Sequence, residues 1–311
     1  MFPRGGFMLR CRELLAILAL GLCAQTAGAE PREVLLPHGN LELSGVLEIA
    51  PGRTVADGVV LMLHGNMAHA DMGVMRQFRK ALNESGFSTL AINLSLKHNR
   101  RRGMLECDGT IGHRVEDALP ELRAWLDWLA RQGARSATLL GFSRGGHQVG
   151  WFLAEHPHPL VRSAVLLAPI VGRDGAAAER YQARYGKPLA PLLKQARALV
   201  AAGRADAVLD QAGFLSCDAA RVSAAAFLSH YGLAEKNDTP ALLARIRVPT
   251  LVVVAGGDEI ARDTEPRLRP HIDGKLRRLV VVPGADHFFH DLYGEDAGDV
   301  LVKFLRGLQG G

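Results

Sequence analysis

Short runs of apolar and β-branched residues recur along this chain, and most of them are continuous rather than alternating. Continuous runs are typical of strands covered by helices on both faces, whereas a half-exposed strand alternates apolar and polar side chains. The predicted strands are 41–49, 59–63, 89–94, 137–142, 164–168, 250–255 and 278–282. Segments with helical periodicity lie between several of them, at 72–85, 114–131 and 145–155. This alternation predicts an α/β domain built on a mostly parallel sheet.

The segment 172–245 interrupts the alternation. It is rich in Ala, Leu, Arg and Gln, it has helical periodicity, and it contains no convincing strand. We therefore expect a helical insertion in the α/β domain. Its aromatic side chains are predicted either to shape a partly apolar pocket or to fill a core, and they are Tyr181, Tyr185, Phe214, Phe227 and Tyr231.

The first 29 residues have the layout of a signal peptide. Arg4, Arg10 and Arg12 precede the apolar run 14–24, and small residues follow up to Ala29. Cleavage after Ala29 would leave residues 30–311 as one domain, delivered to the periplasm or outside the cell. The apolar run is shorter than the roughly 20 residues of a membrane-spanning helix, so no integral membrane segment is expected. An uncleaved anchor is the alternative.

Charge and cysteine content narrow the functional classes. The formal charge is +5, of which the leader supplies three arginines and one glutamate, so the remaining chain carries only about +3. This mild excess does not indicate nucleic-acid binding, and the run 100–102 of three arginines is interpreted as a solvated loop. Beyond the leader only Cys107 and Cys217 are left. In an oxidising compartment they are predicted to form a disulfide, the alternative being two buried thiols.

One motif carries a specific chemistry. The residues 141–146, Gly-Phe-Ser-Arg-Gly-Gly, stand directly after a predicted strand and directly before a predicted helix. This context is that of a nucleophile elbow, a strained turn that presents a serine hydroxyl and tolerates only small neighbours. Ser143 is the candidate nucleophile.

A serine hydroxyl needs a general base, and the base needs a group that orients it. His287 follows the strand 278–282 and is the candidate base. Asp258 follows the strand 250–255 and is the preferred orienting acid, with Glu259 and Asp263 as alternatives. Asp286 is interpreted instead as a loop carboxylate that caps local backbone amides.

A tetrahedral intermediate requires two amide donors for its oxyanion. The amide of Arg144, directly after the nucleophile, is predicted to be one. Asn66, in the loop after the strand 59–63, is predicted to supply the other, with Met67 as the alternative. His64 is expected to brace this loop rather than to act as a second base.

The motifs Leu63-His64-Gly65-Asn66, Gly141-Phe142-Ser143-Arg144-Gly145, Gly256-Gly257-Asp258 and Gly284-Ala285-Asp286-His287 resemble those of the α/β-hydrolases. The resemblance spans about 41–308 and implies a mostly parallel eight-stranded sheet, a cap formed by the insertion 172–245, and no cofactor. Serine at the elbow separates the chain from the dienelactone hydrolases, which it otherwise resembles and which use cysteine. Many relatives carry an apolar residue and a proline shortly after the acid, whereas Ile260-Ala261-Arg262-Asp263 stands here.

The resemblance implies a carboxylesterase acting on a small-molecule ester. A thioesterase, lipase or peptidase of the same fold, or a ligand-binding relative without turnover, are the alternatives. A metal site is not expected, because neither His287 and His290 nor the histidines at 156 and 158 have zinc-ligand spacing. Phe288 and Phe289 are predicted to pack His287 and line the pocket.

Overall fold

This computed structural model describes residues 1, 30–172, 177–232 and 238–309. The predicted signal peptide lies outside these residues except for Met1, so it stays a prediction. Within the described ranges, no helix combines the length and apolar character needed to cross a bilayer.

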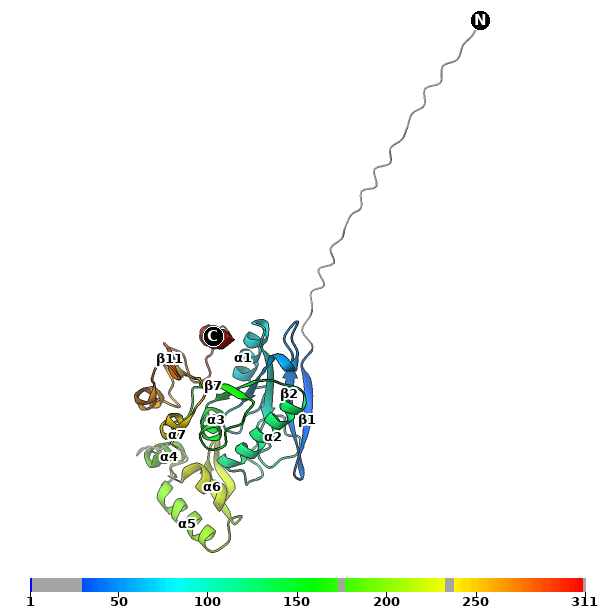
Figure 1. Cartoon of the computed structure of the whole chain (residues 1–311). Helices are drawn as coiled ribbons and strands as arrows, with labels where there is room; N and C mark the ends of the chain where they lie inside the picture. Colours follow the sequence, from blue (N-terminus) through cyan, green and yellow to red (C-terminus); the bar gives the residue numbers. More distant parts are fainter. Residues whose placement is uncertain (2–29, 173–176, 233–237, 310–311) are drawn as a thin grey trace.

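An eight-stranded sheet forms the centre of the domain (Figure 1), with the strand order β1-β2-β4-β3-β6-β7-β10-β11. β1 and β2 run antiparallel to their neighbours, and the other neighbouring pairs are parallel. All seven predicted strands are present, and β1 was not predicted. The strands are β1 (Arg32–His38), β2 (Leu41–Glu48), β3 (Val59–Leu63), β4 (Ser88–Asn93), β6 (Ala137–Phe142), β7 (Val161–Leu167), β10 (Thr250–Ala255) and β11 (Arg277–Val282).

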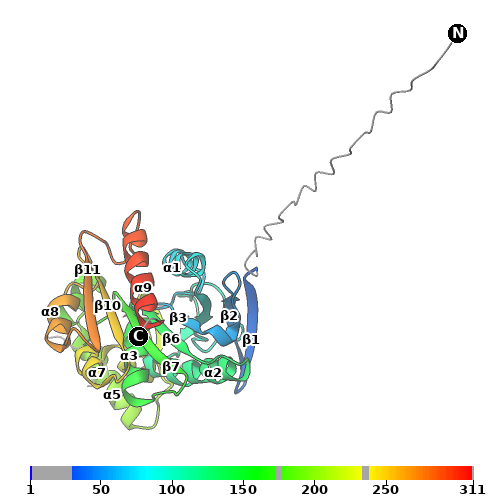
Figure 2. The same ribbon diagram turned by 45° about the horizontal axis from the view of Figure 1, so that its top comes forward.

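Helices cover both faces of this sheet, as the continuous apolar runs require. Val60 and Met62 of β3 pack with α1 (Gly73–Glu84) and α9 (Tyr293–Gln309). Leu61 and Leu63 pack on the opposite side with three other helices. Figure 2 shows the two groups of helices on opposite sides of the strands. The second group is α2 (Ala118–Arg131), α3 (Arg144–Glu155) and α7 (Thr239–Arg245).

Short helical turns complete the connections, namely η1 (Val55–Asp57), η2 (Val115–Asp117), α8 (Thr264–Leu268) and η4 (Arg269–His271). Pro120 lies inside the predicted helix 114–131. The α-helix begins only at Ala118, after η2, so this proline falls in the first turn, where its missing N–H costs no intrahelical bond.

The insertion between β7 and β10 is not purely helical. It contains α4 (Ala177–Tyr185), α5 (Leu189–Ala201) and α6 (Ala224–Tyr231), gathered at one end of the domain (Figure 1). It also contains the antiparallel strands β8 (Val208–Phe214) and β9 (Cys217–Ser223), and β9 pairs in parallel with the short strand β5 (Thr110–Ile111). The prediction of a segment without strands is therefore wrong. Its strands pair irregularly and contain Asp, Ala and Gly, residues with little strand preference.

Cys107 and Cys217 form the predicted disulfide. Cys107 lies in the long connection after β4, and Cys217 is the first residue of β9. The bridge therefore fastens the insertion to the body of the domain, across a sequence separation of 110 residues.

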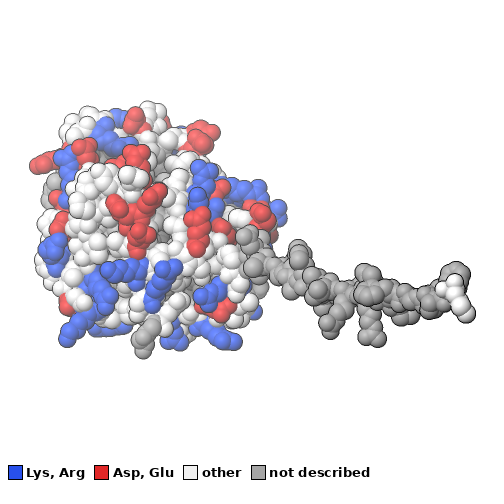
Figure 3. Space-filling view, turned by 90° about the horizontal axis from the view of Figure 1, so that it is seen from above, with Lys and Arg blue, Asp and Glu red and all other residues white. Residues whose placement is uncertain are grey.

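Acidic and basic side chains are interspersed on the face of the molecule shown in Figure 3. Within the run of three arginines, Arg100 pairs with Glu42 and Arg102 pairs with Glu33, and both arginines are exposed. Arg101, in contrast, is buried. The interpretation of the run as a solvated loop is wrong for this residue, because its guanidinium finds hydrogen-bond acceptors inside the domain.

Candidate active site

Three loops meet at the carboxyl edge of the sheet, and each brings one predicted residue. Ser143 follows β6, Asp258 follows β10, and His287 follows β11. His287 Nε2 lies 2.9 Å from Ser143 Oγ, and His287 Nδ1 lies 2.6 Å from Asp258 Oδ2. All three residues are buried. The structure thus joins them in one continuous chain of hydrogen bonds.

The turn at Ser143 has the strained geometry that the motif predicts. Ser143 has φ 56° and ψ −118°, a backbone conformation that residues other than glycine rarely adopt. Its amide donates to the carbonyl of Leu167 at 2.8 Å, which holds the turn in place. A Cβ on Gly141 would lie 2.2 Å from the Gly145 carbonyl oxygen, and one on Gly145 would lie 2.5 Å from that of Leu63. Both positions therefore require glycine.

Asp258 is held by donors on both of its oxygens. Its Oδ1 accepts the amides of Ile260 and Ala261, each at 2.8 Å, while Oδ2 faces His287. Burial alone would raise the pKa of the Asp258 carboxyl, but the hydrogen bonds from His287 and the two amides outweigh burial and lower it. The group is therefore an oriented carboxylate at neutral pH.

The alternative acids lie elsewhere. Glu259 is exposed and lies 3.9 Å from Arg262, and Asp263 lies 4.0 Å from Arg180. Neither carboxylate contacts the histidine.

Asp286 has the predicted local role, because its carboxylate accepts the amide of His290 at 3.0 Å and lies 2.6 Å from its Nδ1. The two aromatic residues between the histidines differ. Phe288 packs edge-on against His287, with ring centroids 5.2 Å apart, and lines the pocket. Phe289 points into the core against Phe78 of α1, so its predicted place in the pocket is wrong.

The loop after β3 makes a tight turn beside the nucleophile. The amide of Ala68 reaches back to the Gly65 carbonyl, and Met67 has φ 52°. Asn66 lines the pocket, whereas Met67 is buried and its Sδ accepts a hydrogen bond from Ser216. Arg144 opens α3, where an amide has no intrahelical acceptor. This arrangement favours the amides of Asn66 and Arg144 as the oxyanion donors.

His64 supports the loop after β3 through hydrogen bonds at both ring nitrogens. Its Nδ1 donates to the Gly65 carbonyl at 2.7 Å, and its Nε2 accepts from the Leu94 amide at 3.1 Å and from Arg101 Nη2 at 2.8 Å. Burial, then the charge of Arg101, holds the pKa of His64 well below its usual value. The ring is therefore neutral and occupied at both nitrogens, as a bracing role requires. The contribution of Arg101 was missed because a charged run in sequence carries no sign of burial.

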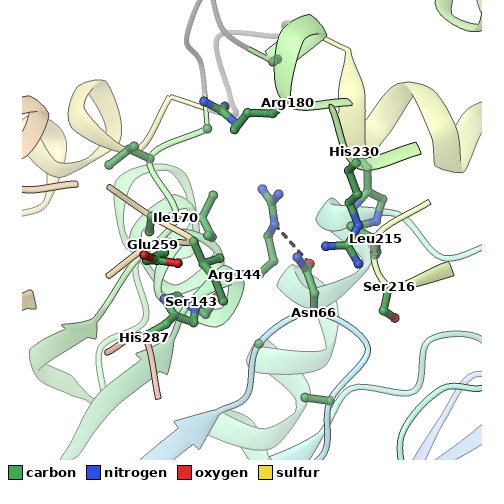
Figure 4. A pocket seen from close by; sticks show the side chains of 18 of the residues that line it. Asn66, Ser143, Arg144, Ile170, Arg180, Leu215, Ser216, His230, Glu259 and His287 are labelled. Carbon is green, nitrogen blue, oxygen red and sulfur yellow. Dashed lines mark hydrogen bonds between the residues drawn. The ribbon is translucent and has the colours of Figure 1, made fainter. Parts of the chain in front are cut away.

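A cavity of about 920 Å³ opens over the loops that carry Ser143 and His287 (Figure 4). Ser143 and His287 lie at its floor, and Arg180 of α4 lies at the opposite rim. The aromatic residues of the insertion divide between the two predicted roles. Three tyrosines line the cavity, whereas the two phenylalanines are fully buried in the core of the insertion. The tyrosines are Tyr181, Tyr185 and Tyr231, and the phenylalanines are Phe214 and Phe227.

Three of the four histidines considered as metal ligands have hydrogen-bond partners in the protein, and His156 is exposed. His287 belongs to the hydrogen-bond chain above, His290 contacts Asp286, and His158 Nε2 lies 3.1 Å from Asp127. Among the residues that the structure describes, no group of three or more His, Cys, Asp or Glu side chains is arranged to hold a metal ion.

Comparison with known proteins places the chain in a family. The model of the alpha/beta hydrolase family matches residues 60–304, and the chain belongs to that family. Its fold is similar to that of Est1E from Butyrivibrio proteoclasticus, with a TM-score of 0.63 at 15% identity over 90% of this chain and 99% of that one.

Two further solved structures share the fold. The monoacylglycerol lipase of Paleococcus ferrophilus matches with a TM-score of 0.61 at 20% identity, over 85% of this chain and 98% of that one. The dienelactone hydrolase of Anabaena variabilis matches with a TM-score of 0.55 at 19% identity, over 90% of this chain and 99% of that one. A comparison with curated protein sequences finds no match.

Proposed function

We propose that this α/β hydrolase is an exported serine hydrolase that cleaves carboxylic esters through an acyl-enzyme intermediate. The observation that carries the proposal is the unbroken chain of hydrogen bonds from Ser143 Oγ through His287 to Asp258 at the floor of the cavity. These hydrogen bonds activate the weakly nucleophilic serine hydroxyl, because the histidine can accept its proton.

In the first half of the reaction, Ser143 Oγ attacks the ester carbonyl carbon while His287 Nε2 takes the hydroxyl proton. The carbonyl oxygen becomes an oxyanion that accepts hydrogen bonds from the amides of Asn66 and Arg144. When the C–O bond to the alcohol breaks, His287 returns the proton to the departing oxygen. The products of this half are the free alcohol and an acyl group bound to Ser143.

In the second half, water replaces the alcohol. His287 takes a proton from the water, the resulting hydroxyl attacks the acyl carbon, and the same two amides bind the oxyanion. The bond to Ser143 Oγ then breaks, the oxygen regains its proton from His287, and the carboxylic acid leaves. The Asp258 carboxylate holds the imidazole in the required tautomer throughout and stabilises the imidazolium that forms twice in each cycle.

The similar structures support an ester substrate, because they include a monoacylglycerol lipase and a dienelactone hydrolase. Export is supported by the signal-like leader and by the disulfide, since disulfides persist in oxidising compartments.

The test is steady-state hydrolysis of 4-nitrophenyl acetate and butyrate, with a matched thioester and anilide, by wild type and variants. Ser143→Ala and His287→Ala are expected to lose all but about one part in 10⁴ to 10⁶ of kcat. Ser85→Ala, at the end of α1 and far from the cavity, is the control and should match wild type. Ester turnover that persists in Ser143→Ala would refute the proposal, and preference for the thioester or anilide would correct the substrate class.

A further inference from the structure

Arg144 differs from the other arginines of the cavity because its side chain is half-buried and, among the described residues, has no acidic partner. It follows the nucleophile directly, and its guanidinium stands in the cavity beside Asn66 (Figure 4). Its Nε lies 3.4 Å from Asn66 Oδ1, and its two terminal nitrogens have no hydrogen-bond partner among the described residues. Within the same residues, no carboxylate lies within 4.0 Å of it, and Tyr231 is the ionisable group that acts on it most.

This guanidinium is charged. Burial lowers the pKa of Arg144 to about 10, which still leaves it protonated at neutral pH. Its histidine neighbours add no charge, because burial lowers the pKa of His147 to about 3 and holds that of His230 well below its usual value. Among the described residues, the deep part of the cavity therefore carries one positive charge. A half-buried cation without a counter-ion has lost part of its hydration, and it attracts an anion more strongly than a fully solvated cation does.

The other charged groups of the cavity lie at its rim. Glu259 pairs with Arg262 at 3.9 Å and Asp263 with Arg180 at 4.0 Å, and all four side chains are exposed. The remaining arginine, Arg184, is exposed and stacks over a tyrosine ring. These groups are solvated or paired, so they do not neutralise the charge at the floor.

We propose that Arg144 binds a carboxylate of the substrate, so that the enzyme selects esters that carry a free carboxylate group. The inference rests on the proposed ester hydrolysis and adds the substrate class. A guanidinium presents parallel N–H donors that match the two oxygens of a carboxylate. One positive charge fits a singly charged group, and the half-buried position in the cavity strengthens the attraction relative to bulk water.

The test compares two pairs of substrates, each with one charged and one neutral member. In 4-nitrophenyl hydrogen glutarate against 4-nitrophenyl pentanoate the carboxylate is on the acyl side, and in 4-acetoxybenzoate against 4-acetoxybenzamide it is on the alcohol side. The readout is the ratio of kcat/KM for the charged and neutral members. In Arg144→Met this ratio is expected to fall about 30-fold or more for at least one pair, as for loss of one partner of an enclosed charge pair.

Two further variants control the comparison. Arg144→Lys keeps the charge without the planar fork and should give an intermediate ratio. Arg197→Met removes one charge from the exposed side of α5, outside the cavity, and should keep the ratio of wild type. An unchanged ratio in Arg144→Met for both pairs would overturn the proposal, as would an equal fall in Arg197→Met.

A direct binding measurement separates this proposal from the proposed hydrolysis. Glutarate and glutaramide are titrated into the wild type and Arg144→Met and followed by calorimetry. Glutarate should bind the wild type, with an affinity that falls as salt rises, and should bind Arg144→Met about 30-fold more weakly. If no ester is cleaved but this difference is found, the hydrolase proposal fails and the carboxylate site stands. If glutarate does not bind a wild type that cleaves neutral esters, the carboxylate site fails alone.

Discussion

Loss of the Cys107–Cys217 bridge is expected to destabilise the fold by an amount that follows from its position. The two cysteines are 110 residues apart in sequence, so the bridge restricts a long loop of the unfolded chain. The chain-entropy relation for a loop of this size gives about 5 kcal/mol at 25 °C. The double substitution to serine keeps the side-chain size close to that of cysteine, so the entropic contribution dominates the change.

The assay is urea unfolding followed by far-ultraviolet circular dichroism, for the oxidised wild type and the double variant. The fully reduced wild type is the second comparison and should lose the same free energy. A difference below about 1 kcal/mol between the oxidised and bridge-free proteins would refute the loop-closure argument, since it lies far under the value for so long a loop.

Three further predictions concern the site and its supports. Asp258→Asn should lower kcat for ester hydrolysis about 10⁴-fold, because an amide favours the wrong imidazole tautomer, and a loss under tenfold would contradict the assigned role. Arg101→Met should lower kcat by about tenfold or more with little change in KM, because the loop that carries an oxyanion donor loses a support; a change confined to KM would contradict this. The pKa of His147 is lowered by burial to about 3, so the unfolded chain binds more protons below pH 6.5 and stability is lost as the pH falls. His147→Gln should remove about 1.4 kcal/mol per pH unit from this dependence between about pH 6 and pH 3, as measured by urea unfolding at several pH values, and an unchanged slope would contradict the buried neutral state.

The sequence was sufficient to predict the parts of the site that follow strand ends. Ser143, Asp258 and His287 each lie within five residues of the end of a continuous apolar run, and parallel strands place such positions at one edge of the sheet. Glycine spacing around the serine added the local geometry, because the turn at Gly141 and Gly145 has no room for a Cβ.

The parts that could not be predicted depend on contacts between distant segments. β8 and β9 stabilise each other as a hairpin, and their sequences are interrupted by Asp, Ala and Gly, which have little strand preference. β1 is an edge strand that contains Pro37, a residue that lowers strand propensity and is tolerated there. Arg101 lies in a run of three arginines, which predicts a surface position. Its buried contact with His64 depends on the fold, because the two residues are far apart in sequence.

The central claim is that Ser143 is an activated nucleophile. The most direct measurement is labelling of the folded protein with a fluorophosphonate probe, followed by peptide mass spectrometry to locate the modified residue, with Ser143→Ala as the control. The account predicts a single adduct on Ser143 that is absent from the variant. A folded wild type that remains unlabelled, or a label of equal intensity on Ser143→Ala, would contradict it.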